Sequence, residues 1–226
     1  MTTLAPSRRA TAVSLAAVGA LALGAALVLL LQVIPPTDAI SATRRTISEY
    51  GLSANKEIFN LAVVLVATGS AAGLAALAYQ RRLPVVSAVL GALWTSGLLV
   101  IVAFPKHDWR VDPTLSAGGT AHRIASIMAF AALPLAVLCA AKRAFPHSPG
   151  RRRLARLLAL ASFGWLVAIL TAVVIAVSTG RDWWLIIPYG LEERGMALTE
   201  LLALASLLTP VREQAEPVPA PARVTV

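Results

Sequence analysis

The strongest constraint on the fold of this chain is a series of long apolar runs that hold almost no charged side chain. A membrane-crossing α-helix needs about 20 predominantly apolar residues, because the hydrocarbon core of a bilayer is about 30 Å thick. Five runs approach or reach that length unaided, and a sixth does so if its helix begins near Tyr189 and carries three charged residues in its first turns. The apolar runs are residues 13–34, 58–79, 83–104, 124–141, 157–178 and 195–209. The sequence therefore predicts an all-α, polytopic membrane protein with six transmembrane helices in one bundle.

Composition agrees with this fold class. Only 14% of the residues are charged, against about 25% in soluble domains. The first apolar run is longer than the roughly 7–15 residues of a signal-peptide core, so we expect it to stay as a span. The domain organisation predicted is a short N-terminus at 1–12, a transmembrane domain at 13–209 and a disordered Pro/Ala-rich tail at 210–226. A single cysteine, Cys139, rules out an internal disulfide.

Basic residues are distributed unevenly between the segments that connect the apolar runs. The N-terminus, the 81–82 turn, segment 142–156 and the tail together hold 12 basic and two acidic residues. The other three connections hold eight of each. The positive-inside rule then predicts that both termini are cytoplasmic and that the protein lies in the inner (plasma) membrane. The excess positive charge predicts contact with anionic membrane lipids, and it requires no nucleic-acid partner.

The exterior segment "FPKHDWRVDPTLSAGGTAHR", residues 104–123, concentrates titratable side chains between two apolar runs. Phe104 precedes a proline, so the third helix should end there. The two glycines at 118–119 should interrupt regular structure and Thr120 should cap the fourth helix, leaving His122 and Arg123 in its first turn. We interpret the remaining charged and aromatic positions as ordinary interfacial residues: Lys106, His107, Trp109 and Arg110.

Three exterior loops at one end of a small bundle must lie close together, so their polar side chains should form an extracytoplasmic polar cluster. Its expected members are Tyr50, Asp108, His122, Arg123, Glu193 and Arg194. The alternative is that these groups pair at the surface while Trp183 and Trp184 anchor the interface. A zinc site built from His107, Asp108, Asp112 and His122, with Glu193 as a further ligand or base, fits no compact spacing, so we predict neither a metal nor a cofactor.

Glu200 is the one charged residue expected inside the bilayer. It lies seven residues after Glu193, so the two share a helix face, with Glu200 roughly 10 Å deeper. A carboxyl at that depth must be protonated or paired, and it should face the bundle interior. No lysine or arginine occurs at that depth in any predicted span. The expected hydroxyl partners are Thr68, Ser70, Thr95, Ser96 and Thr171, with Ser126 a weaker candidate.

Three short motifs resemble those of the "domain of unknown function 998" family of six-helix bacterial and archaeal membrane proteins. They are F-P-x-x-D at Phe104–Asp108, G-x-x-H at Gly119–His122 and G-L-x-x-R at Gly190–Arg194. The resemblance covers about residues 13–209. It implies the fold but no established activity, and it directs attention to Asp108, His122 and Arg194. It does not require an acid at Glu193.

Three classes of function are compatible with these features. The first is binding of a lipid headgroup or small amphiphile in an exterior polar pocket. The second is a membrane-embedded lipid hydrolase, with or without a metal, that uses His122 and Asp108. The third is a proton-coupled transporter with Glu200 as the relay. An enzyme needs its acid–base groups within about 3 Å of a common point, whereas a binding protein needs a cavity with apolar walls and a few polar groups.

Overall fold

The chain is described by a computed structural model over residues 8–108, 111, 114, 116–182 and 186–209. The described residues form helices and contain no strand. The long helices are α1 (Arg8–Leu31), α2 (Lys56–Tyr79), α3 (Val85–Ala103), α4 (Ala117–Ala144), α5 (Pro149–Thr179) and α7 (Tyr189–Leu208). Two short 3-10 helices, η1 (Thr37–Ala39) and η2 (Ile47–Leu52), lie in the connection between α1 and α2. This all-helical fold is the one predicted from the apolar runs.

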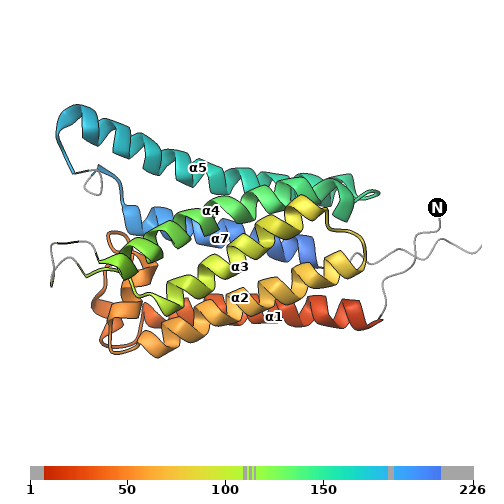
Figure 1. The fold of residues 1–226 in the computed structure, drawn as a ribbon, viewed down its shortest axis with the longest axis horizontal. Helices are drawn as coiled ribbons and strands as arrows, with labels where there is room; N and C mark the ends of the chain where they lie inside the picture. The colour runs from red at the N-terminus through yellow and green to blue at the C-terminus, as the bar shows by residue number, and fades with distance from the viewer. Residues whose placement is uncertain (1–7, 109–110, 112–113, 115, 183–185, 210–226) are drawn as a thin grey trace, which may run out of the picture.

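The long helices run side by side along one axis, with α5 at the edge of the bundle (Figure 1). The most extensive contacts join α1 to α2, α3 to α4, and α5 to α7. The long connections at 32–55, 104–116 and 180–188 gather at one end, which we call the loop end. The short connections at 80–84 and 145–148 lie at the opposite end, which we call the turn end.

Five of these helices are long and apolar enough to cross a membrane: α1, α2, α3, α4 and α5. Helix α7 has 20 residues but carries Glu192, Glu193, Arg194 and Glu200, and it falls outside that set. Large apolar side chains point outward on the flanks of the bundle, among them Leu29, Val89 and Leu170, each more than half exposed. Such an apolar outer surface suits contact with lipid. The chain therefore has the character of a membrane protein, with five helices apolar enough to span and a more polar sixth long helix among the described residues.

The start of α4 differs from the expectation drawn from sequence. The helix begins at Ala117, and the side chain of Ser116 caps it by accepting a hydrogen bond from the Gly119 amide at 3.0 Å. The Thr120 hydroxyl instead donates to the carbonyl of Ser116 at 3.0 Å. Thr120 is thus not the cap, and the two glycines belong to the first turn. The serine satisfies an amide that would otherwise lack a partner, so the helix begins three residues before the predicted cap.

Small residues allow the helices to approach closely. A Cβ on Gly69 would lie 2.9 Å from the Ala20 side chain of α1, and one on Gly73 would meet Leu208 of α7. A buried hydrogen bond of 3.0 Å from the Trp94 indole to the Ser70 hydroxyl joins α3 to α2. Helix α2 therefore contacts α1, α3 and α7, and it also contacts η2 at the loop end.

Candidate functional site

The start of α7 docks directly onto the connection between α1 and α2. The amides of Gly190 and Leu191 both donate to the carbonyl of Thr43, at 3.0 and 3.3 Å. A Cβ on Gly190 would lie 2.8 Å from the Ala42 carbonyl oxygen and closer still to that of Arg45. Only glycine permits this approach of two backbones.

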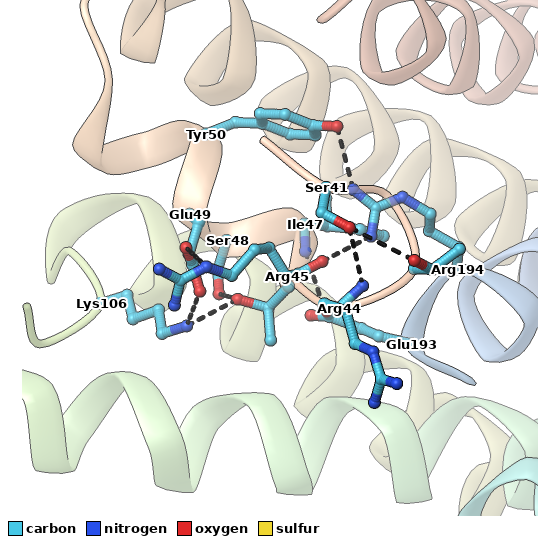
Figure 2. Close-up of polar contacts among 12 residues, drawn as sticks. Ser41, Arg44, Arg45, Ile47, Ser48, Glu49, Tyr50, Lys106, Glu193 and Arg194 are labelled. Carbon is cyan, nitrogen blue, oxygen red and sulfur yellow. Dashed lines mark hydrogen bonds and ion pairs between the residues drawn. The ribbon is translucent and has the colours of Figure 1, made fainter. Parts of the chain in front are cut away.

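Arg194, one turn further along α7, fastens the same connection with its guanidinium group. Nη1 donates to the carbonyls of Arg45 at 2.7 Å and Gly190 at 2.9 Å, and Nη2 donates to the Tyr50 hydroxyl at 2.9 Å (Figure 2). The guanidinium carbon also lies 5.6 Å from the centre of the Tyr50 ring, whose residue is fully buried. The planar guanidinium group spreads its donors over separate nitrogens and so reaches these three acceptors, whereas the three donors of a lysine ammonium group diverge from a single atom.

Glu193 faces the same connection. Its Oε2 accepts a hydrogen bond of 2.7 Å from the amide of Ile47, the first residue of η2. Thr46 occupies the capping position of η2 but makes no side-chain capping bond. The Glu193 carboxylate therefore replaces a local cap from 146 residues away. Tyr50, Glu193 and Arg194, three predicted members of the cluster, do lie together; we call them, with Gly190, the α7 clamp.

Lys106 is not the ordinary interfacial residue that the sequence suggested. Its ammonium group donates to the Thr46 hydroxyl at 2.7 Å and to Glu49 Oε1 at 2.9 Å, and its side chain is only 23% exposed. Glu49 also pairs with Arg45 at 3.4 Å. Lys106 thus ties the α3–α4 connection to η2. Opposite charges in two neighbouring loops were the available signal, but sequence could not say which pair would meet.

His122 sits at the wall of a small cavity beside these contacts. Its residue is 6% exposed, and Nδ1 lies 2.9 Å from the Phe104 carbonyl oxygen. A carbonyl can only accept, so Nδ1 carries the proton in this bond, and in the neutral ring Nε2 is left as an acceptor. The cavity has a volume of about 100 Å³. Its polar lining residues are Ser48, Lys56, Glu57, Asn60, Lys106 and His122, and its apolar walls include Phe59, Ile101 and Val102.

The other predicted cluster members lie elsewhere. Asp108 lines a different and more open hollow of about 380 Å³, together with Phe104, Ser116 and Gly119. Arg123 is exposed on α4. The contacts of Arg194 are with the clamp, and it lines neither hollow. Of the three family-motif residues, Asp108 and His122 therefore line different hollows, and Arg194 lines neither.

No group of three or more His, Cys, Asp or Glu residues in the described part of the chain is arranged to hold a metal ion. Of the metal candidates weighed from sequence, Asp112 lies outside the described residues. The same is true of Trp109, Arg110, the proposed interfacial anchors Trp183 and Trp184, and the tail at 210–226.

Glu200 faces the bundle interior, as its position in α7 predicted. It is fully buried, and its Oε1 accepts a hydrogen bond of 2.9 Å from the Ser162 hydroxyl of α5. Ser162 was not among the expected partners. The threonines that were expected donate to carbonyls of their own helices instead, as Thr68 does to Val64 at 2.8 Å and Thr171 to Val167 at 2.8 Å. Back-bonding of this kind is a common alternative for a hydroxyl in a helix.

Comparison with known families finds one match. The model of the family described as "Protein of unknown function (DUF998)" matches residues 16–210. No curated protein and no solved structure matches the chain. The match spans every long helix except the first turns of α1, and it includes all three motifs identified from the sequence. The chain therefore belongs to the DUF998 family.

Proposed function

We propose that this protein binds the polar headgroup of a lipid, or a small amphiphile, in the cavity beside His122. The observation that carries the proposal is the combination of an enclosed volume of about 100 Å³, apolar walls and converging polar groups from η2, α2 and α4. Converging polar groups of this kind can fix the orientation of a small bound headgroup, and the neighbouring apolar side chains can contact the rest of the molecule. Lys56 and Lys106 would face an anionic group, and Glu57 with His122 Nε2 would accept hydrogen bonds from a donor.

The same proposal includes the membrane topology. We infer six spans, with α7 as the sixth, because Glu200 and Glu193 on α7 are buried against other helices and only Glu192 and Arg194 are partly exposed. The charge difference between the two ends supports cytoplasmic termini in a plasma membrane. The cavity at the loop end would then open to the exterior, where α2 and α3 meet the headgroup region.

The proposal can be tested by occluding the cavity from one side of α2. Asn60→Phe places a large ring into the cavity, whereas Leu61→Phe changes the neighbouring residue, which is 52% exposed on the outer face. Both full-length variants would be purified in mild detergent and their bound lipids identified by native mass spectrometry. We expect the wild type and Leu61→Phe to retain one tightly bound lipid or amphiphile that Asn60→Phe loses.

His122→Gln gives a second and independent comparison. A glutamine side chain has the wrong geometry to donate a hydrogen bond to the Phe104 carbonyl and to accept one from a ligand at the same time. The amount of bound lipid or amphiphile that the variant retains should therefore fall about tenfold. The proposal fails if Asn60→Phe and Leu61→Phe retain the same bound species in the same amount. It also fails if the wild type carries no species beyond the detergent and bulk lipid.

The two alternative functions have less support. A hydrolase using His122 and Asp108 would need both side chains at one point, and they line different hollows. A transporter using Glu200 would need polar groups leading to it, and the partner that the structure gives Glu200 is Ser162 on the adjacent helix. The headgroup-binding function therefore explains more of the arrangement at the loop end.

A further inference from the structure

The turn end carries a dense group of cations without a single acidic partner among its described residues. Its charged side chains belong to the two short connections and to the helix ends beside them: Arg9, Arg81, Arg82, Lys142, Arg143, Arg151, Arg152, Arg153 and Arg156. No Asp or Glu occurs in the described segments 8–20, 75–90, 138–160 and 203–209 that form this end. The loop end, in contrast, pairs its cations with Glu49 and its backbone donors with Glu193.

Part of this group has a structural role. Arg82 donates to the Ala144 carbonyl, Arg143 Nε to the Arg81 carbonyl at 2.8 Å, and Arg151 to the carbonyls of Ser206 at 3.0 Å and Thr209 at 2.5 Å. Cations are favourable at the carboxyl ends of helices, where carbonyls lack partners. These three arginines fasten the ends of α4 and α7 and hold the two connections together.

Arg152, Arg153 and Arg156 have no such role. No hydrogen bond or ion pair of their side chains is formed with the described residues, and the last two are exposed. Helical spacing places Arg153 and Arg156 on one face of α5, turned away from the buried positions Ala155 and Ala159, whereas Arg152 lies nearer the side of those alanines. The same face continues into the apolar part of α5 with Leu157 and Leu160, which are 57% and 54% exposed.

This arrangement is unfavourable by itself. Three guanidinium groups within five residues repel one another, and the first turns of a helix carry a positive partial charge that disfavours cations. No acidic residue occupies the first turn of α5 to offset that cost. A bound anion would remove both penalties. Because exposed leucines continue the face, the complementary molecule has a negative headgroup joined to hydrocarbon chains.

We propose that Arg153 and Arg156 form a specific site for the phosphate of an anionic phospholipid, with its acyl chains lying along Leu157 and Leu160. Basic groups between or beside membrane helices on the cytoplasmic side bind such headgroups. The site lies at the opposite end from the cavity beside His122 and does not depend on the function proposed for that cavity.

The test uses the full-length chain, purified and delipidated in a neutral detergent. Phosphatidylglycerol and phosphatidylcholine with identical acyl chains would be titrated in separate experiments, with bound lipid counted by native mass spectrometry. Arg153→Gln/Arg156→Gln removes two charges from the site. Arg44→Gln/Arg181→Gln removes two exposed charges from the loop end and serves as the matched control.

We expect the wild type and the control to bind phosphatidylglycerol at least tenfold more tightly than phosphatidylcholine. Two lost arginine contacts of about 1 kcal/mol each should weaken phosphatidylglycerol binding by the site variant about 30-fold. Arg153→Lys/Arg156→Lys keeps the charge and should recover most of the affinity. Unchanged gel-filtration profiles and melting temperatures in phosphatidylcholine would show that each variant is folded.

Three results would overturn the proposal. The first is equal phosphatidylglycerol affinity in the site variant and the wild type. The second is an equal loss in the Arg44→Gln/Arg181→Gln control, which would reveal a general charge effect. The third is full competition by millimolar inorganic phosphate, because the ligand would then be a free phosphate and the leucines would contribute nothing.

Discussion

At the scale of single residues, the G-L-x-x-R motif has a structural explanation. Gly190 lets the start of α7 approach the backbone of residues 42–45, and Arg194 binds the Arg45 carbonyl and Tyr50 from the next turn. Both residues therefore fix the first long connection onto the bundle. A motif of this kind marks how the loop end is assembled, and it does not by itself indicate catalysis.

The close approach at Gly190 can be tested with an alanine substitution. Gly190→Ala places a methyl group within 3 Å of two carbonyl oxygens, so the connection must move, at a cost of about 1–3 kcal/mol. Gly164 of α5 is the matched control, because a Cβ there meets nothing within 4 Å. Gly164→Ala should leave stability unchanged or raise it by up to about 1 kcal/mol. Equal melting temperatures for the two variants in detergent would contradict this explanation.

The guanidinium group of Arg194 should be irreplaceable by lysine. Arg194→Lys keeps the charge but cannot bind the Arg45 carbonyl, the Gly190 carbonyl and Tyr50 together, so we expect a loss of about 1.5–3 kcal/mol. Tyr50→Phe removes one of these bonds and should cost about half as much. Because the two residues share an interaction, the double variant should melt close to Arg194→Lys alone. Strictly additive losses would mean that the bond to Tyr50 contributes nothing.

At the scale of helices and loops, the sequence correctly predicted the helix positions and ends that depend on a local pattern of residues. The lengths of the apolar runs located all six long helices, and Phe104-Pro105 located the end of α3, because span length and proline act locally. The predicted start of α4 was wrong because two residues four positions apart, a serine and a threonine, are both good helix caps. The partners of Lys106 and Glu200 could not be predicted, since each depends on how separate elements pack.

The long-range cap on η2 gives a prediction at this scale. Glu193→Ala removes the acceptor of the Ile47 amide, so residues 41–52 should open more often, with about tenfold faster hydrogen–deuterium exchange at Ile47. Glu192→Ala is the control, because the adjacent carboxylate makes no bond to this connection among the described residues and should leave its exchange unchanged. Slow exchange of residues 41–52 in both variants would show that other contacts suffice to hold η2.

At the scale of the whole molecule, the connections at the two ends of the bundle are held in different ways. At the loop end, hydrogen bonds of Glu193 and Arg194 join the α1–α2 connection to α7, and one of Lys106 joins it to the α3–α4 connection. The turn end needs no such network, because its connections are short, and arginines bind the helix carbonyls there. The loop end is thus the one rigid and polar enough to shape a cavity, while the charge of the turn end favours its position beside anionic lipid.

The proposed topology can be tested with single cysteines in a Cys139→Ala background. Ala54→Cys lies in the α1–α2 connection, His147→Cys in the α4–α5 connection, and both positions are exposed; Val226→Cys reports the C-terminus. With six spans and cytoplasmic termini, a membrane-impermeant maleimide should label only Ala54→Cys in intact cells, and the other two after permeabilisation. Labelling of both Val226→Cys and Ala54→Cys in intact cells would mean that α7 does not span the membrane. Helix α7, with its buried carboxyls, would then begin and end on the exterior side. Labelling of His147→Cys and Val226→Cys without Ala54→Cys would keep six spans but reverse their orientation, and the cavity beside His122 would face the cytoplasm.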